Sequence, residues 1–178
     1  MSKRIGVFDS GIGGLTVLRE LISSHKTEYV YIGDTLRAPY GNKTKEELLS
    51  HTKELLNFLK SKGCETFISA CNSLSSLDTE YLIKELNIEK ENYIDMVSAT
   101  KNHIKGDIDV NAKVLVYGTV ATINSGAYQD VFKGYDLSVL ATSELASGIE
   151  TEDQIIIDEE VDNLVDSLLT NKITHLFL

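Results

Sequence analysis

Two short stretches of the chain combine side chains that could act chemically on a small polar molecule. The first, Asp9-Ser10-Gly11-Ile12-Gly13-Gly14, has three glycines that permit a tight turn and expose backbone amides to an anion. The second, Cys71-Asn72-Ser73, places a thiol beside an amide and a hydroxyl. A cysteine that leads into a helix has its thiolate favoured by the nearby amide dipoles. We therefore predict an anion-binding turn after Asp9 and a reactive thiol at Cys71.

Both stretches also have an ordinary structural interpretation. Glycine turns between a strand and a helix are common, and a buried cysteine is often a small apolar packing group. Cys64 lies between a helix and a strand without polar company, and we assign it to packing. The glycine run is not a dinucleotide fingerprint, because its third glycine is misplaced and Gly33, rather than an acid, ends the next strand.

Two further loops, each of which follows a predicted strand, also carry polar side chains. They are Arg37-Ala38-Pro39-Tyr40-Gly41 and Gly118-Thr119-Val120-Ala121-Thr122-Ile123. Pro39 is the only proline in the chain, and we expect it to fix a turn that orients Tyr40 and the Gly41 amide. Each threonine could equally serve only to cap a helix.

Rigid elements must position these loops, and the chain alternates short β-branched runs with longer amphipathic segments. This pattern is typical of βα units that build a parallel sheet. We predict strands at about 4–8, 29–33, 66–70, 112–117, 136–140 and 173–178. A capping box, Thr44-x-x-Glu47, predicts the start of a helix. Its apolar face would carry Leu48, Thr52, Leu55, Leu56 and Leu59. A later helix, at about 158–170, places Val161, Leu164, Val165, Leu168 and Leu169 at helical spacing.

The order of these elements predicts two similar parallel-sheet α/β lobes with a cleft between them. A soft boundary near 93–103 separates a first lobe at 1–95, on the Asp9 and Cys71 side, from a partial second lobe at 96–178. In open α/β sheets, ligands bind beyond the carboxyl ends of the strands. The loops described above follow predicted strands, so we expect them to line the cleft.

Composition narrows the classes of partner. The 178 residues are 42% apolar and carry 17 basic against 27 acidic groups, a net charge of −10 that repels nucleic acid and anionic lipid. We find neither a signal peptide nor an apolar run long enough to span a bilayer, and we expect a cytoplasmic protein with reduced thiols. The four histidines are scattered without metal-ligand spacing, so we assign no metal.

Several of these stretches, taken in order, closely resemble glutamate racemases of the aspartate/glutamate racemase family. They are Gly6 to Leu18, Gly33-Asp34-Thr35, Pro39 to Lys43, Ala70-Cys71-Asn72, and Gly118-Thr119 through Ser125-Gly126-Ala127-Tyr128. The resemblance implies interconversion of L- and D-glutamate without a cofactor, with one cysteine on each face of the substrate, for D-glutamate supply to peptidoglycan. One thiolate abstracts the proton on Cα and the opposite thiol donates one.

The resemblance also implies roles for individual residues. Cys71 is one of the two bases, and Asp9 is the acidic neighbour that assists it. The positions implied to hold the ammonium and carboxylates of the substrate are Asp9, Ser10, Tyr40, Gly41, Asn72, Ser73, Thr119 and Thr122. No cofactor is implied.

The sequence departs from the family in three places. Ser73 stands where the family usually has threonine. The stretch 141–150 replaces a more apolar segment, although Glu150 matches a family acid. The chain stops after His175-Leu176-Phe177-Leu178, where the family continues into a Gly-Cys-Thr-His motif with the second base. We therefore expect a C-terminally truncated form, with an incomplete second lobe and no C-terminal return to the first lobe.

Such a form is expected to be inactive or impaired as a racemase. Apolar surface left uncovered needs a partner chain, so we expect a homo-oligomer, with a dimer as the simplest case. Two other functions stay open at this stage. One is an aspartate racemase or related amino acid racemase, which would differ in the length of its carboxylate pocket. The other is a non-catalytic amino-acid-binding module.

Overall fold

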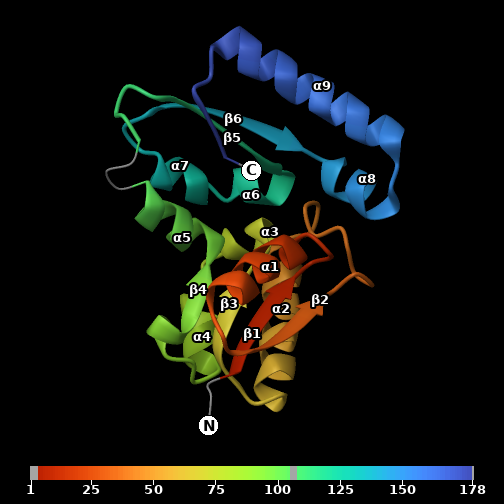
Figure 1. Ribbon diagram of the computed structural model, residues 1–178, viewed down its shortest axis with the longest axis vertical. Coiled ribbons are helices and arrows are strands. Elements are labelled where there is room, and N and C mark those ends of the chain that lie inside the picture. Colours follow the sequence, from red (N-terminus) through yellow and green to blue (C-terminus); the bar gives the residue numbers. More distant parts are fainter. Residues whose placement is uncertain (1–3, 105–107, 178) are drawn as a thin grey trace.

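The computed structural model describes residues 4–104 and 108–177, which form two parallel β-sheets covered by helices (Figure 1). The first sheet, in the order β2-β1-β3-β4, contains β1 (Arg4–Asp9), β2 (Glu28–Gly33), β3 (Cys64–Ser69) and β4 (Tyr93–Asp95). The second, in the order β6-β5-β7, contains β5 (Lys113–Thr119), β6 (Asp136–Thr142) and β7 (His175–Phe177). We call each sheet with its helices the first and the second lobe. The predicted two-lobe α/β architecture is confirmed.

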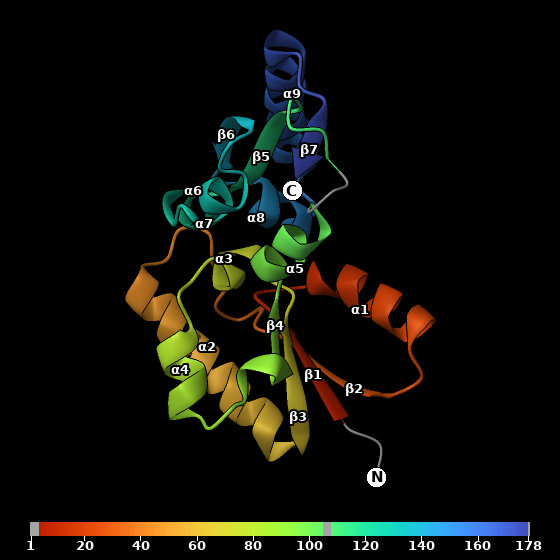
Figure 2. The same cartoon turned by 90° about the vertical axis from the view of Figure 1, so that its left-hand side faces the viewer.

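In the first lobe, helices lie on both faces of the sheet (Figure 2). One face carries α1 (Gly14–Ser24), and the other carries α2 (Lys45–Ser61) and α4 (Glu80–Glu85). The short α3 (Asn72–Ser75) follows β3, and a 3-10 turn, η1 (Lys90–Asn92), leads into β4. The main core lies between the sheet and α2 with α4; its largest members include Phe8, Leu55, Leu56, Leu59, Phe67 and Leu82.

Helix α2 shows how the local sequence fixes an element. The Thr44 hydroxyl accepts a hydrogen bond from the Glu47 amide at 3.2 Å, and the Glu47 carboxylate accepts one from the Thr44 amide at 2.8 Å. The predicted capping box is therefore confirmed. The five residues predicted for the apolar face of this helix are all buried.

In the second lobe, the sheet lies between two helical layers (Figure 1). Helices α5 (Met96–His103), α6 (Val120–Asn124) and α7 (Ala127–Val131) lie on the side toward the first lobe. After β6, α8 (Leu145–Thr151) leads into α9 (Gln154–Asn171), which runs across the far side. The core of this lobe comprises Ile104, Ala112, Val114, Val116, Tyr128 and Phe132.

Two sequence-based expectations about elements need correction. All six predicted strands are present, with bounds that differ by at most two residues from prediction where the structure describes them; residue 178 lies outside the described residues. Strand β4, however, was expected only as a boundary segment. Helix α9 begins at Gln154 rather than near 158, and its apolar residues do not form one buried face: Leu164 and Leu168 are half-buried, whereas Val161, Val165 and Leu169 are exposed. The three-stranded sheet of the second lobe contacts only one side of α9, so the apolar residues on its other sides stay exposed.

The parallel register brings the predicted loops together. Strand β1 lies between β2 and β3, with Phe8 opposite Ser69 and Asp9 opposite Gly33. The Ala70 amide donates to the Phe8 carbonyl at 2.9 Å, and the Asp34 amide donates to the Asp9 carbonyl at 3.0 Å. The segments after all three strands therefore leave the same edge of the sheet, which faces the second lobe. Among the described residues, no helix is both long and apolar enough to cross a membrane.

Candidate functional site

The Cys71 thiol lies at the carboxyl end of β3, beside the turn that follows β1. Cys71 is 5% exposed and is the residue before the first turn of α3. Its Sγ lies 3.6 Å from the Ser10 hydroxyl, within reach of a weak sulfur hydrogen bond. Adjacent parallel strands thus bring together residues that are 61 positions apart in the sequence.

Asp9 holds the glycine turn in place. Its buried Oδ2 accepts hydrogen bonds from the Gly14 amide at 2.8 Å and the Gly11 amide at 3.3 Å. Two of the amides that we predicted to receive an external anion are therefore already bound to the protein's own carboxylate. Below the turn, the Tyr31 hydroxyl donates to the Gly11 carbonyl at 2.7 Å. Gly33 makes this close approach possible, because a Cβ there would lie 2.2 Å from the Gly11 oxygen.

The electrostatic environment of Cys71 differs from the one predicted. Burial, and then the Asp9 carboxylate, raise the pKa of the thiol to about 11, although the Ser10 hydroxyl and the Leu74 and Ser10 amides act in the opposite direction. The amides therefore favour the thiolate as predicted, but burial and the Asp9 charge outweigh them, so the pKa of the thiol shifts upward. Helix α3 has only four residues, too short for its dipole to outweigh burial and a neighbouring negative charge.

A chain of hydroxyl groups joins the two lobes beside Cys71. The Ser73 hydroxyl lies 2.8 Å from that of Thr119, which in turn lies 3.0 Å from that of Thr122. Thr119 also accepts a hydrogen bond from the Thr122 amide at 3.2 Å, so it both caps α6 and reaches the first lobe. Gly41 completes this junction: its carbonyl accepts from the Ala121 amide at 2.8 Å, and a Cβ on it would lie 2.8 Å from Thr119 Cβ.

Asn72, next to Cys71, has a partner in the second lobe. The Tyr128 hydroxyl on α7 donates to Asn72 Oδ1 at 2.7 Å. Tyr128 is 4% exposed and its ring belongs to the core of the second lobe. This tyrosine therefore connects that core to the residue that follows the thiol.

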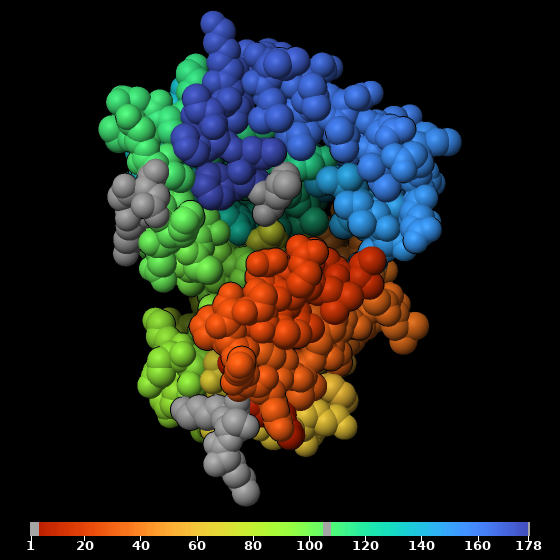
Figure 3. Space-filling model, in the orientation of Figure 1, coloured from red at the N-terminus to blue at the C-terminus, as the bar shows by residue number. Residues whose placement is uncertain are grey.

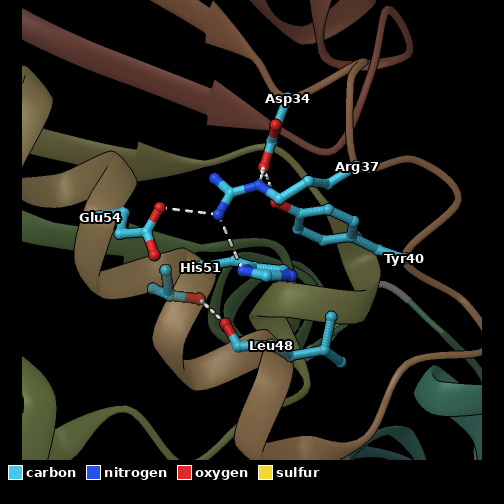
Figure 4. A network of polar contacts seen from close by, with 7 residues as sticks. Asp34, Arg37, Tyr40, Leu48, His51 and Glu54 are labelled. Carbon is cyan, nitrogen blue, oxygen red and sulfur yellow. Dashed lines mark hydrogen bonds and ion pairs between the residues drawn. The ribbon is translucent and has the colours of Figure 1, made fainter.

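The hydroxyl of Tyr40, another predicted substrate-binding residue, is bound within the first lobe. It donates to the Asp34 carboxylate, which also accepts from Arg37 Nε at 2.5 Å (Figure 4). Arg37 Nη1 lies 2.7 Å from Glu54 Oε2 and 3.0 Å from His51 Nδ1, and the His51 ring packs 5.3 Å from that of Tyr40. The Tyr40 phenol is thus fixed in an ionic network on the α2 side, while the Gly41 backbone reaches the lobe junction. The peptide bond before Pro39 is cis.

Glu150 of α8 enters the site from the opposite lobe. A Cβ added to Gly11 would lie 1.6 Å from Glu150 Oε1, so this carboxylate lies directly over the glycine turn. Burial, and then the Asp9 carboxylate, raise the pKa of Glu150, while a hydrogen bond from the Ile12 amide lowers it. Two carboxylates from different lobes therefore interact electrostatically at the glycine turn, which favours a cationic group beside them.

The surface is hollowed where the lobes meet, between α1 and the α8–α9 side of the second lobe (Figure 3). A cavity of about 820 Å³ also lies at the lobe junction, lined by residues that include Gly41, Lys43, Ser75, Asp95, Ala121 and Asp130. Neither Cys71 nor Asp9 lines this cavity, which adjoins the predicted site through Gly41. Within 4–104 and 108–177, no three histidine, cysteine, aspartate or glutamate side chains form a group that could hold a metal ion.

The structure gathers most of the predicted site residues at one junction. Asp9, Ser10 and Cys71 lie together at the sheet edge, and Gly41, Ser73, Thr119 and Thr122 form the adjoining contact between the lobes. Cys64 is buried in the core at the start of β3, as expected. Tyr31, Asp34 and Tyr128 had no predicted role. Asp34 and Tyr128 lie within stretches that resemble the family, as Glu150 matches a family acid, so these residues had a signal in the sequence. Tyr31 had none beyond its place in a strand.

Comparison with known proteins identifies glutamate racemases as relatives of this chain. No family model matches the chain. It is 42% identical over 127 residues to a glutamate racemase of Aquifex pyrophilus, covering 71% of this chain and 48% of that protein. It is 41% identical over 145 residues to a glutamate racemase of Helicobacter acinonychis, covering 79% of this chain and 56% of the relative. The chain therefore spans about half the length of these relatives.

A solved structure supports the same relationship. The crystal structure of a glutamate racemase from Francisella tularensis in complex with D-glutamate matches with a TM-score of 0.79 and 27% identity, covering 98% of this chain and 67% of that one. Sequence similarity and a shared arrangement of strands and helices thus agree. The chain is a homologue of the glutamate racemases, matched over about half of their length.

Proposed function

We propose that the chain binds glutamate between its two lobes and that Cys71 removes and returns the proton on the substrate's Cα, as part of a cofactor-independent glutamate racemase. The observation that carries this proposal is the position of the Cys71 thiol. It lies at the lobe junction, beside Asp9 and a chain of three hydroxyls, in a homologue of glutamate racemases.

The charge distribution suits an amino acid substrate. With a pKa near 11, the Cys71 thiol is protonated in the unliganded protein at neutral pH. A substrate ammonium bound near Asp9 and Glu150 would supply the positive charge that offsets this shift, so that the thiol would lose its proton to solvent and become the thiolate when glutamate binds. The thiolate then takes the proton from Cα, and fixed dipoles stabilise the negative charge left on the substrate.

Hydrogen-bond donors for carboxylates lie on both lobes. We assign this role to the hydroxyls of Ser10, Ser73, Thr119 and Thr122, together with the Asn72 amide and the Gly41 backbone. In this assignment Tyr40 acts through its place in the Asp34 network. The D-glutamate in the Francisella structure supports glutamate as the ligand class, and the smaller aspartate is the alternative.

The positions of the two cysteines determine which reaction we expect of this chain. Cys64 begins β3 and Cys71 follows its end, so the two thiols lie at opposite ends of one strand and cannot flank one substrate. We therefore assign to this chain proton exchange on one face of glutamate, with inversion needing a second acid–base group. The net step returns the abstracted proton, or a solvent deuteron, from Sγ to the same face of Cα.

Incubation of L- and D-glutamate separately with the protein in D₂O tests this function, with the loss of the Cα proton followed by NMR. One enantiomer should exchange its proton with retention of configuration, and Cys71→Ala should abolish the exchange. Cys64→Ala is the matched control and should leave the exchange intact. Binding of glutamate without any exchange would instead identify a non-catalytic amino-acid-binding module.

The wider setting is proposed on the same basis. The enzyme would supply D-glutamate for peptidoglycan from the cytoplasm.

The division into units 1–95 and 96–178 is supported by the end of β4 at Asp95 and the start of α5 at Met96. Exposed apolar side chains on the second lobe support a homo-oligomer, with a dimer as the simplest form; they include Val139, Val165, Leu169 and Leu176.

A further inference from the structure

Tyr128 has one feature that its core position does not require. Its ring packs in the second core with Val114, Val116 and Phe132, where phenylalanine would serve as well. Its hydroxyl nevertheless leaves that core and donates to Asn72 Oδ1, at 2.7 Å, in the other lobe. A buried hydroxyl is costly unless it is hydrogen-bonded, and the contact with Asn72, together with one to Thr100, explains why a tyrosine fits here.

The bond has a chemical consequence for Asn72. A side-chain amide has an acceptor oxygen on one side and a two-donor NH₂ group on the other. In the structure the amide oxygen faces Tyr128, and the NH₂ group is therefore the side turned away from the phenol. A half-turn would exchange this bond for one in which NH₂ donates to the phenol oxygen, so the contact ties the amide to Tyr128 and the observed orientation sets which side carries the donors.

From this geometry we propose that Tyr128 is a positioning residue that fixes the Asn72 amide so that its NH₂ group serves a carboxylate of the bound amino acid. The proposal rests on the proposed function, because it names the part of the substrate that Asn72 recognises. It makes the second lobe a determinant of carboxylate recognition, because the Asn72 oxygen faces Tyr128 and the donor side of the amide is turned away from that residue.

Tyr128→Phe is the direct test, because it removes one oxygen and keeps the ring. Tyr135→Phe is the matched control, since Tyr135 packs against the same core with its ring 5.9 Å from Phe132. A first readout needs no ligand: the NMR order parameter of the Asn72 side-chain amide should fall in Tyr128→Phe and stay unchanged in Tyr135→Phe. An equally ordered amide in Tyr128→Phe and wild type overturns the proposal, whether or not the protein binds glutamate.

A second readout tests the carboxylate role by calorimetry. Tyr128→Phe should weaken glutamate binding about fivefold to tenfold, the size expected for one hydrogen bond. Glutamine and isoglutamine each carry an amide in place of one of the two glutamate carboxylates. The substitution should weaken binding less for the analogue that lacks the carboxylate contacted by Asn72. Equal losses for glutamate and both amides would indicate a general structural effect and contradict the proposal. Absence of glutamate binding by wild-type protein would overturn the proposed function, while the amide order parameter would still decide the role of Tyr128.

Discussion

At the scale of single residues, the central feature is a thiol whose properties depend on distant neighbours. Asp9 ends β1 and Cys71 follows β3, and only the parallel pairing of these strands places the carboxylate beside the sulfur. The sequence predicted that Cys71 follows a strand and leads into a helix, and the structure confirms this position. It could not predict the direction of the pKa shift, because burial and the Asp9 charge arise from tertiary contacts.

Asp9→Asn should lower the pKa of the Cys71 thiol below its value of about 11. The carboxylate charge raises this pKa, and asparagine removes the charge while its carbonyl can still accept from the Gly14 amide. The ¹³Cβ chemical shift of Cys71 as a function of pH reports the change, with Cys64 as an internal reference. An unchanged or higher midpoint in Asp9→Asn would contradict the electrostatic role of Asp9.

Gly41 offers a steric test of the lobe junction. A Cβ at Gly41 would lie 2.8 Å from Thr119 Cβ, whereas one at Gly118 would lie no closer than 3.4 Å to any neighbour. Gly41→Ala should therefore lower the free energy of unfolding by about 1–3 kcal/mol, and Gly118→Ala by much less. Urea denaturation measures both, and equal effects would show that the Gly41 contact with Thr119 does not constrain the lobes.

At the scale of elements, the alternation of β-branched runs and amphipathic segments predicted the six main strands well. Strand β4 was missed because its three residues run directly into α5 at Met96, whereas the three-residue β7 lies in a longer apolar run. For α9, the spacing of the apolar residues predicted a helix. It could not predict which of them are exposed, because burial depends on the elements that pack against the helix. The placement of Tyr128 and Glu150 at the site depends on the packing of one lobe against the other and was likewise beyond local patterns.

Neighbouring leucines in α9 provide a test of that assignment. Leu168 is half-buried, whereas Leu169 is 73% exposed. Leu168→Ala should cost about 1–2 kcal/mol of unfolding free energy, less than a fully buried leucine, and Leu169→Ala should change it by less than about 0.5 kcal/mol. Thermal and urea denaturation measure the unfolding free energies of the two variants. Equal losses for both would indicate one continuous buried apolar face on α9 and contradict the assignment.

The network on α2 makes stability depend on pH through His51. Burial, and then the Arg37 charge, lower the pKa of His51 from its usual 6.5, so the folded protein favours the neutral ring, which accepts from Arg37 at Nδ1. The corresponding stability is complete above pH 6.5 and is lost as the pH falls from there toward the folded-state pKa. Between about pH 7.5 and about pH 5.5, wild type should lose more stability than His51→Gln. If urea denaturation gives the same pH dependence of the unfolding free energy for both proteins, His51 does not contribute in this way.

At the scale of the whole molecule, the site exists only where the two lobes touch. Ser73 meets Thr119, Gly41 meets Ala121, Asn72 meets Tyr128, and the Glu150 carboxylate lies over the Gly11 turn. Each pair joins a residue of the first lobe to one of the second. Binding between the lobes should therefore depend on residues far from Cys71 in sequence as much as on its own loop.

The most direct test of this account is a glutamate titration followed through the ¹³Cβ resonance of Cys71. In wild type, glutamate should shift this resonance toward the thiolate position, because the bound ammonium lowers the thiol pKa. Thr119→Val should weaken the response, because it removes the hydroxyl that bridges the lobes, while Thr66→Val, in β3, should not. A Cys71 resonance that is unaffected by saturating glutamate, or that responds equally in both variants, would contradict a shared site between the lobes.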